Sequence, residues 1–236
     1  MEFAFTEEQE MIRDTAASFL AEVSDSAAVR RAMGTEQGYE PELWGRICSE
    51  MYWQAIHIPE AYGGMGLGYV ELVAMMEQMG RSLLCSPFFS TVCLAGNALR
   101  VAGSEAQQAR WLAQLCEGTL TATLAFNGGS SRWDAESITA TWRHEGDGYM
   151  LDGDYRYVID GHTADLLIVA ARAEGTTDDE GISLFLLPAA TSGVSRQWLA
   201  TMDQARKQAA VQLNGVSLTA DALMGEPGQG WTSLSK

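Results

Sequence analysis

Basic residues are scarce in this 236-residue chain, which carries 15 lysines and arginines against 31 aspartates and glutamates, for a formal net charge of −16. Such a chain repels the phosphates of nucleic acids and of anionic lipids, and no local cluster of Lys and Arg offsets the repulsion. No apolar run has the length of a membrane span, and the sequence begins MEFAFTEE, which is acidic where a signal peptide is basic. We therefore expect a cytoplasmic protein that binds neither nucleic acid nor membrane.

Cysteine and histidine are also few, with four and three copies. No C-x-x-C pair and no His/Cys spacing typical of a metal site occurs, so we expect no metal. The sequence contains no P-loop and no G-x-S-x-G motif, and the glycines between Gly64 and Gly68 lack the third glycine of a dinucleotide fingerprint. The cysteines lie in apolar helical patterns and are interpreted as small core residues in a reducing compartment: Cys48, Cys85, Cys93 and Cys116.

Helical patterns occupy the first half of the chain. Thr6 and Gln9 have the spacing of a capping box, and apolar residues follow at helical intervals. Pro41 suits the first turn of another helix, and Ser104 caps a later one that closes at Gly118. We predict a helical bundle for residues 1–118.

At Thr119 the hydrophobic period changes from that of helices to that of strands. Short runs rich in β-branched and aromatic residues follow, with Asp147-Gly148 as a hairpin turn. These runs predict a small antiparallel β-barrel or sandwich over residues 119–223, so the expected fold class is α+β. Residues 224–236 are too few to bury a face of their own and are interpreted as the start of a further helical domain. Other turns are predicted at glycines: Gly153, Gly161, Gly193 and Gly215.

The most informative segment runs from Leu151 to Gly161, L-D-G-D-Y-R-Y-V-I-D-G, and is followed from Ala164 by the apolar run A-D-L-L-I-V-A-A. Together with P-E-A-Y-G-G-M-G-L-G, which starts at Pro59, these segments resemble the acyl-CoA dehydrogenase family. The resemblance runs from the first helix to the final turn. It implies the N-terminal helical and middle β domains of that family without its C-terminal helical domain. The R-W-D sequence at Arg132 resembles a divergent branch whose members often form unlike pairs that act on bulky acyl-CoA esters, such as those of steroid side chains or dicarboxylates.

The resemblance implies a binding site for FAD. In the family pattern L-N-G-x-K-x-W-I-T-N-G, the aromatic residue lies against the flavin ring and the Thr hydroxyl lies near its polar edge. The matching residues here are Tyr157 and Ile159, so the aromatic side chain is kept and the hydroxyl is lost. A second family segment, T-E-P-x-A-G-S-D, corresponds to a strand end where Phe126 replaces the Thr and Asn127 replaces the Glu. The cofactor-binding residues that the resemblance implies are Thr123, Leu124, Ala125, Phe126, Asn127, Tyr157, Val158 and Ile159.

The loop after the second segment is expected to meet the anionic parts of the ligands. Backbone amides of Gly128, Gly129 and Ser130 suit an anion, because a glycine-containing turn can point successive N–H groups outward. The resemblance places Ser131 and Arg132 on the substrate side.

The family activity implied is FAD-dependent α,β-dehydrogenation of an acyl-CoA thioester, with an electron-transfer flavoprotein or similar acceptor and a homo- or hetero-oligomeric assembly. No catalytic base can be named, because the resemblance implies a base on helices beyond the end of this sequence. The helical carboxylates that are present have the spacing of a solvated face. The alternative is a catalytically inactive partner subunit, which Phe126 and Ile159 favour. An acyl-CoA oxidase or a flavin monooxygenase of the same fold is a lesser rival. The carboxylates considered and not promoted are Glu7, Glu8, Glu10, Glu71 and Glu77.

Overall fold

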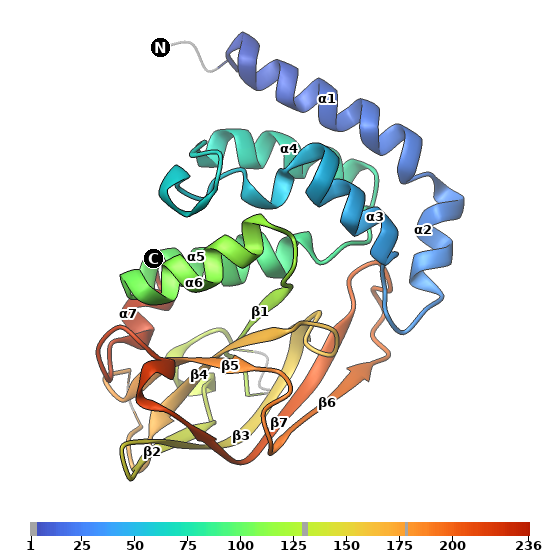
Figure 1. Cartoon of the computed structure of the whole chain (residues 1–236). Coiled ribbons are helices and arrows are strands. Elements are labelled where there is room, and N and C mark those ends of the chain that lie inside the picture. The colour runs from blue at the N-terminus through green and yellow to red at the C-terminus, as the bar shows by residue number, and fades with distance from the viewer. Residues whose placement is uncertain (1–3, 129–131, 178) are drawn as a thin grey trace.

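A computed structural model describes residues 4–128, 132–177 and 179–236. Helices form the upper layers of the molecule and strands the lower part, and the described chain ends beside α5 and α6 (Figure 1). The helical part contains α1 (Glu7–Val23), α2 (Ser26–Met33), α3 (Pro41–Arg46), η1 (Ile47–Met51), η2 (Trp53–Ala55), η3 (Glu60–Tyr62), α4 (Tyr69–Arg81), η4 (Phe89–Gly96), α5 (Asn97–Ala102) and α6 (Glu105–Cys116), with α7 (Gly230–Leu234) at the end of the chain.

Side-chain caps fix where the long helices begin. Thr6 Oγ1 accepts from the N–H of Gln9 at 3.3 Å, and Gln9 Oε1 accepts from the N–H of Thr6 at 3.0 Å, so the predicted capping box is confirmed. Ser104 and Gln107 form the same box at α6. Sequence analysis missed α2, whose N-cap is Asp25. The polar residues around that cap have the composition of a loop, although they begin a helix.

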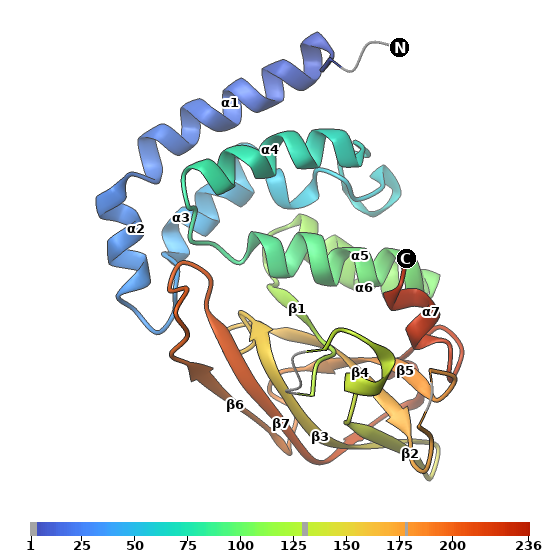
Figure 2. The ribbon, with the colours of Figure 1, turned by 180° about the vertical axis from the view of Figure 1, so that it is seen from behind.

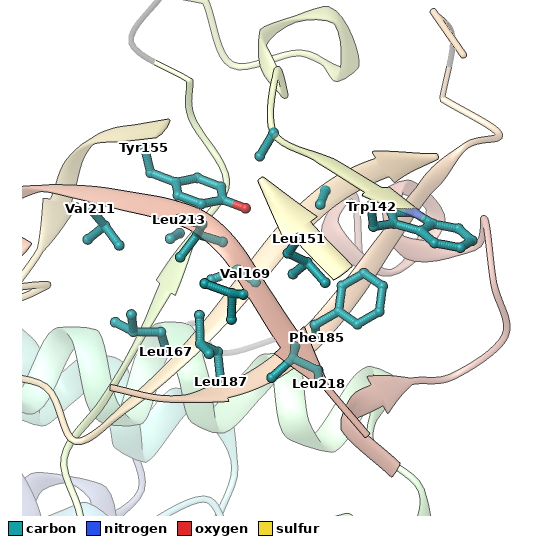
Figure 3. Close-up of a cluster of buried hydrophobic side chains, with 14 of the residues drawn as sticks. Trp142, Leu151, Tyr155, Leu167, Val169, Phe185, Leu187, Val211, Leu213 and Leu218 are labelled. Atoms are coloured by element: carbon teal, nitrogen blue, oxygen red, sulfur yellow. The ribbon is translucent and has the colours of Figure 1, made fainter. Parts of the chain in front are cut away.

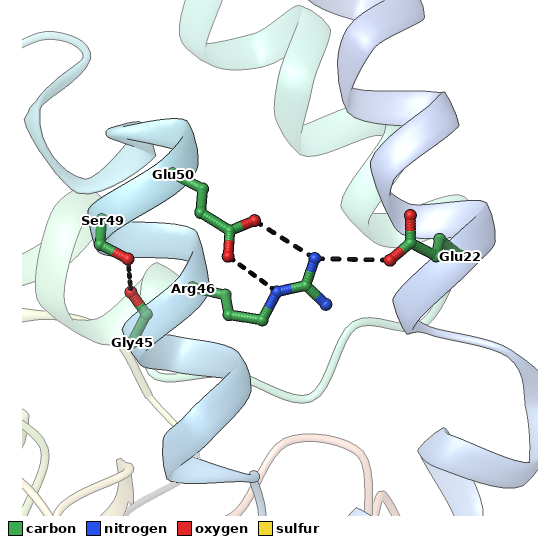
Figure 4. A network of polar contacts seen from close by, with 5 residues as sticks. All are labelled: Glu22, Gly45, Arg46, Ser49 and Glu50. Atoms are coloured by element: carbon green, nitrogen blue, oxygen red, sulfur yellow. Dashed lines mark hydrogen bonds and ion pairs between the residues drawn. The ribbon is translucent and has the colours of Figure 1, made fainter.

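The helices farthest from the sheet pack on one another. α1 and α4 lie side by side, as both views show (Figures 1 and 2), and share a core cluster that includes Leu20 and Met75. Arg46 of α3 pairs with Glu50 and also reaches Glu22 of α1 at 3.4 Å, which ties the two helices at the surface (Figure 4). Because these side chains are largely exposed to solvent, the ion pairs contribute little to stability.

The strands form one path with two ends. Its order is β6-β7-β3-β2-β4-β5-β8, with β1 added on β4. The β1–β4 and β2–β4 pairs are parallel, and the other pairs are antiparallel. The strands are β1 (Ala122–Ala125), β2 (Thr141–Glu145), β3 (Gly148–Ile159), β4 (Leu166–Ala173), β5 (Ile182–Pro188), β6 (Val194–Leu199), β7 (Gln208–Leu218) and β8 (Leu223–Met224).

The sheet is open, so of the two expected forms, barrel or sandwich, the barrel is wrong, whereas the predicted fold class, helices followed by a mostly antiparallel β part, is confirmed. Within the described residues no pairing joins β6 to β8, and β2 meets β4 over only two residue pairs. The path therefore folds over itself as a sandwich. Figure 3 shows side chains of β3 and β7 facing those of β4 and β5 across the interior. The labelled core residues are Trp142, Leu151, Tyr155, Leu167, Val169, Phe185, Leu187, Val211, Leu213 and Leu218.

β4 and β5 are buried on both faces. Leu167 and Val169 point into the sandwich, while Leu166 and Ile168 join a second cluster with helical residues such as Leu112. This burial explains the unbroken apolar run of β4, which a half-exposed strand does not need. Each fully buried aliphatic side chain contributes about 1.5–3 kcal/mol.

Two details of the predicted turns are corrected. The hairpin between β2 and β3 turns at Gly146 and Asp147, one residue earlier than expected, because Glu145 pairs with Gly148. Gly153 lies inside β3, where the register with β7 shifts, and Gly215 lies inside β7 with a positive φ. Neither glycine lies in a connection between strands. Among the residues that the structure describes, no helix is long and apolar enough to cross a membrane.

Candidate functional site

The two segments assigned to flavin binding lie next to each other. Thr123 of β1 donates from Oγ1 to the carbonyl oxygen of Ile159 at the end of β3, at 2.6 Å. The N–H of Arg156 donates to the carbonyl oxygen of Asn127 at 2.9 Å. Thr123 is completely buried, so its hydroxyl is committed to fixing this junction. The two segments are therefore in contact, although they are not neighbours along the chain.

The end of β3 has an unusual backbone. Tyr157 has a φ of 63° and Asp160 a φ of 53°, both in the left-handed region that residues other than glycine seldom adopt. The pairing of β3 with β7 shifts register between Tyr155 and Val158, which marks a bulge. As a result Tyr157 is 51% exposed while Tyr155 and Val158 are buried. The bulge turns one aromatic side chain out of the core beside β1.

A buried acid supports this strand end from behind. Asp160 is 7% exposed, and its Oδ2 accepts from Ser90 Oγ at 2.6 Å. Its N–H donates to the carbonyl oxygen of Lys207 at 2.9 Å. Burial raises the pKa of Asp160 to about 6, against the opposing effects of Ser90 and Arg206. The sequence alone assigns no role to Asp160 or to Ser90, because neither residue carries a local signal for this contact.

The second segment presents aromatic surface. Phe126 is partly buried and meets the ring of Trp133 edge-on, with 5.7 Å between centroids, and Trp133 is 80% exposed. Asn127 is buried. The N–H of Gly128 donates to the carbonyl oxygen of Ser137 at 2.9 Å. The expectation that this amide is available to an anion is therefore wrong.

The residues expected on the substrate side are only partly described. Ser131 lies outside the described residues, as do Gly129 and Ser130. Arg132 is exposed and forms ion pairs with Asp134 at 2.6 Å and Glu136 at 3.1 Å. Its contact with substrate stays a prediction.

The residues present fit the ring of a flavin better than its polar edge. The side chains of Ala125 and Val158 are buried, so these residues can offer a ligand only their backbone. Leu124, Phe126, Tyr157 and Ile159 retain exposed area. An aromatic and aliphatic surface of this kind suits a flat conjugated ring. The side-chain hydroxyl of Thr123 is directed inward and is not part of that surface.

The described residues contain no candidate metal site. In the described ranges, no group of three or more His, Cys, Asp and Glu side chains is placed to hold a metal ion. The cysteines are free thiols, and burial raises the pKa of Cys48 and of Cys93 to about 12.

Helices followed by a mostly antiparallel sheet define the class of fold. The candidate site adds an exposed aromatic residue where β3 meets β1. Residues 6–119 match the acyl-CoA dehydrogenase N-terminal domain. The chain is 30% identical over 206 residues to acyl-CoA dehydrogenase IpdE2 of Mycobacterium tuberculosis, across 87% of this chain and 51% of that protein. The chain belongs to the acyl-CoA dehydrogenase family. It spans about half the length of this curated relative.

Solved structures show the same fold. A chain from the electron transferring flavoprotein structure of Acidaminococcus fermentans superposes with a TM-score of 0.88 at 26% identity, covering 99% of this chain and 62% of that one. A chain of the ChsE4-ChsE5 complex from Mycobacterium tuberculosis gives a TM-score of 0.85 at 26% identity, covering 99% of this chain and 61% of that one.

Proposed function

We propose that this chain binds FAD and supplies the flavin-facing surface of an acyl-CoA dehydrogenase that acts on an acyl-CoA thioester in the cytoplasm. The observation that carries the proposal is Tyr157, held half-exposed by a left-handed bulge beside the end of β1. When bound, the flavin supplies the redox chemistry by accepting a hydride from the substrate. Membership of the family and the name of the relative IpdE2 support this activity.

The chain's own residues position the cofactor. Tyr157 offers an aromatic face, and the hydrogen bond from Thr123 to Ile159 holds the two segments in register. Asp160 and Ser90 anchor the strand end to the helical part. Two side-chain hydroxyl groups at the ring edge are missing relative to the family, one at Phe126 and one at Ile159. Each lost hydrogen bond to a buried polar edge costs about 1–3 kcal/mol, so this chain should hold FAD more weakly than family members by roughly two to four powers of ten.

The domain limits and partners belong to the same proposal. We assign residues 1–118 to a helical domain, 119–223 to a β domain and 224–236 to the approach to a further helical domain. An electron-transfer flavoprotein or a similar acceptor is the proposed electron acceptor, and the proposed assembly is a homo- or hetero-oligomer. The ChsE4-ChsE5 complex, which pairs two proteins, supports an unlike pair.

Two exposed tyrosines allow a matched test. Tyr157 and Tyr52 are 51% and 56% exposed, and both have a positive φ, of 63° and 54°. Titration of the protein with FAD, followed by flavin fluorescence, should show that Tyr157→Ala raises Kd about tenfold because a ring contact is lost. Tyr157→Phe and Tyr52→Ala should leave Kd unchanged. Equal effects of Tyr157→Ala and Tyr52→Ala would refute the assignment.

The second candidate is a partner subunit without flavin, which the apolar Phe126 and Ile159 and the inward hydroxyl of Thr123 favour. Visible spectra of the protein, alone and together with neighbouring gene products, distinguish the two functions. Flavin absorbance in the protein alone supports the first. Absorbance only in a complex, unaffected by Tyr157→Ala, supports the second.

A further inference from the structure

A hollow opens between the end of α4 and the loop that joins β6 to β7. Its apolar walls include Met76, Met79, Leu83 and Phe88. Leu83 has a φ of 50° and is 61% exposed, so the backbone holds an apolar side chain in a strained conformation at this hollow. None of the residues that line the hollow belongs to the candidate flavin surface.

One guanidinium lines the same hollow. The central carbon of the Arg206 guanidinium lies 4.5 Å from the centroid of the Phe89 ring, a cation–π contact, and Phe89 is also a lining residue. Within the part of the chain that the structure describes, no carboxylate forms an ion pair with Arg206. Arginines such as Arg46, Arg132 and Arg143 are paired with acids. Arg206 therefore offers donors to an anion at the border of an apolar space.

An opposite charge on the same loop gives the hollow a defined polarity. Asp203 also lines it, and its Oδ1 accepts from the N–H of Ala205 at 2.9 Å. This hydrogen bond fixes the carboxylate within the turn, so it does not neutralise Arg206 by direct contact. A ligand that carries a negative charge should thus be attracted by Arg206 and repelled by Asp203.

We propose that this hollow binds an apolar chain that ends in a carboxylate, with the chain against Met76, Met79 and Phe88 and the carboxylate on Arg206. The inference goes beyond the proposed function, because it needs neither FAD nor the flavin-facing surface. The same chemistry occurs in a free fatty acid and at the far end of an acyl group that carries a second carboxylate.

Decanoate is the probe for the first source. Titrated below its micellar concentration into protein labelled at the methionine methyl groups, it should shift the NMR signals of Met76 and Met79 saturably. Arg206→Gln should raise Kd about fivefold, the strength of a solvent-accessible ion pair. Asp203→Asn should lower the Kd of decanoate. The Kd of decyltrimethylammonium, a cation with the same chain, should fall in Arg206→Gln and rise in Asp203→Asn.

Arg110 provides a matched control. Its guanidinium lies 4.4 Å from the ring centroid of Trp111 on α6, outside the hollow, and it is exposed like Arg206. Arg110→Gln should not change the Kd of decanoate. The proposal is overturned if decanoate does not saturate the Met76 and Met79 signals, or if Arg206→Gln and Arg110→Gln have equal effects.

A second arm distinguishes the two sources and rests on the proposed function. If the ligand is an acyl thioester, the mono-CoA ester of decanedioic acid should bind more tightly than decanoyl-CoA, and the difference should vanish in Arg206→Gln. If the ligand is a free fatty acid, the two thioesters should bind equally, while decanoate keeps its dependence on Arg206. Failure of FAD binding leaves the decanoate result intact, so the two proposals fail separately.

Discussion

Replacement of Asp160 by Asn should stabilise the protein at neutral pH. Asp160 is buried, and its pKa is raised to about 6 from the ordinary value of 3.8. The folded state therefore holds the proton more tightly than the unfolded state between these values. Stability from this group is greatest below about pH 4 and is lost as the pH rises through 6. The difference between the two pKa values corresponds to about 3 kcal/mol at pH 8, and Asn keeps an oxygen for Ser90.

The measurement is the difference in free energy of unfolding between Asp160→Asn and the wild type as a function of pH. Urea unfolding followed by the fluorescence of the seven tryptophans gives each value. Taking the difference cancels the other carboxyl groups, which are the same in both proteins. The gain of the variant should be near zero at pH 4, rise through pH 5 and 6, and level off at about 3 kcal/mol above pH 7.

A constant difference across this pH range would refute the reasoning, as would a variant that is less stable at pH 8. Asp147→Asn is the control, because it removes the same charge from the exposed turn between β2 and β3. Its difference from the wild type should stay small at every pH.

Three further predictions use the same unfolding measurement. Ser90→Ala removes the hydroxyl that donates to Asp160 and should cost about 1–3 kcal/mol, with a larger loss at pH 8 than at pH 5; an equal loss at both contradicts it. Thr123→Val keeps the side-chain shape but loses the bond to Ile159 and should cost about 1 kcal/mol. Gly64→Ala would place a Cβ 1.9 Å from the carbonyl oxygen of Ile58 and should cost about 3 kcal/mol, whereas Gly45→Ala, with open space, should not destabilise.

Local patterns in the sequence predict the element types well. The capping boxes at Thr6 and Ser104 and the change of period at Thr119 locate the helical and strand regions, because each depends on residues a few positions apart. The helix α2 was missed although its N-cap at Asp25 is also a local feature, because the polar residues around this cap resemble a loop.

Long-range pairing could not be predicted from such patterns. β1 pairs in parallel with β4, with Ala122 opposite Leu166. The residues of these two strands do not indicate which strand each pairs with. The openness of the sheet depends on these choices. Likewise Ser90 and Asp160 are separated by 70 positions, and neither residue type by itself indicates the contact. The family motifs name the residues of the candidate surface, whereas its buried support required the three-dimensional structure.

The two-faced burial of β4 and β5 has a consequence for synthesis of the chain on the ribosome. The apolar faces of α5 and α6, including Leu99, Leu112 and Leu115, are covered by Leu166, Ile168 and their neighbours. Those strands are translated later. At about 5–20 residues per second, the interval between Leu115 and Leu186 lasts roughly 4 to 14 s. During that time the nascent helices have no sheet to pack on, so chaperones that shield apolar surface should engage the chain before β5 emerges.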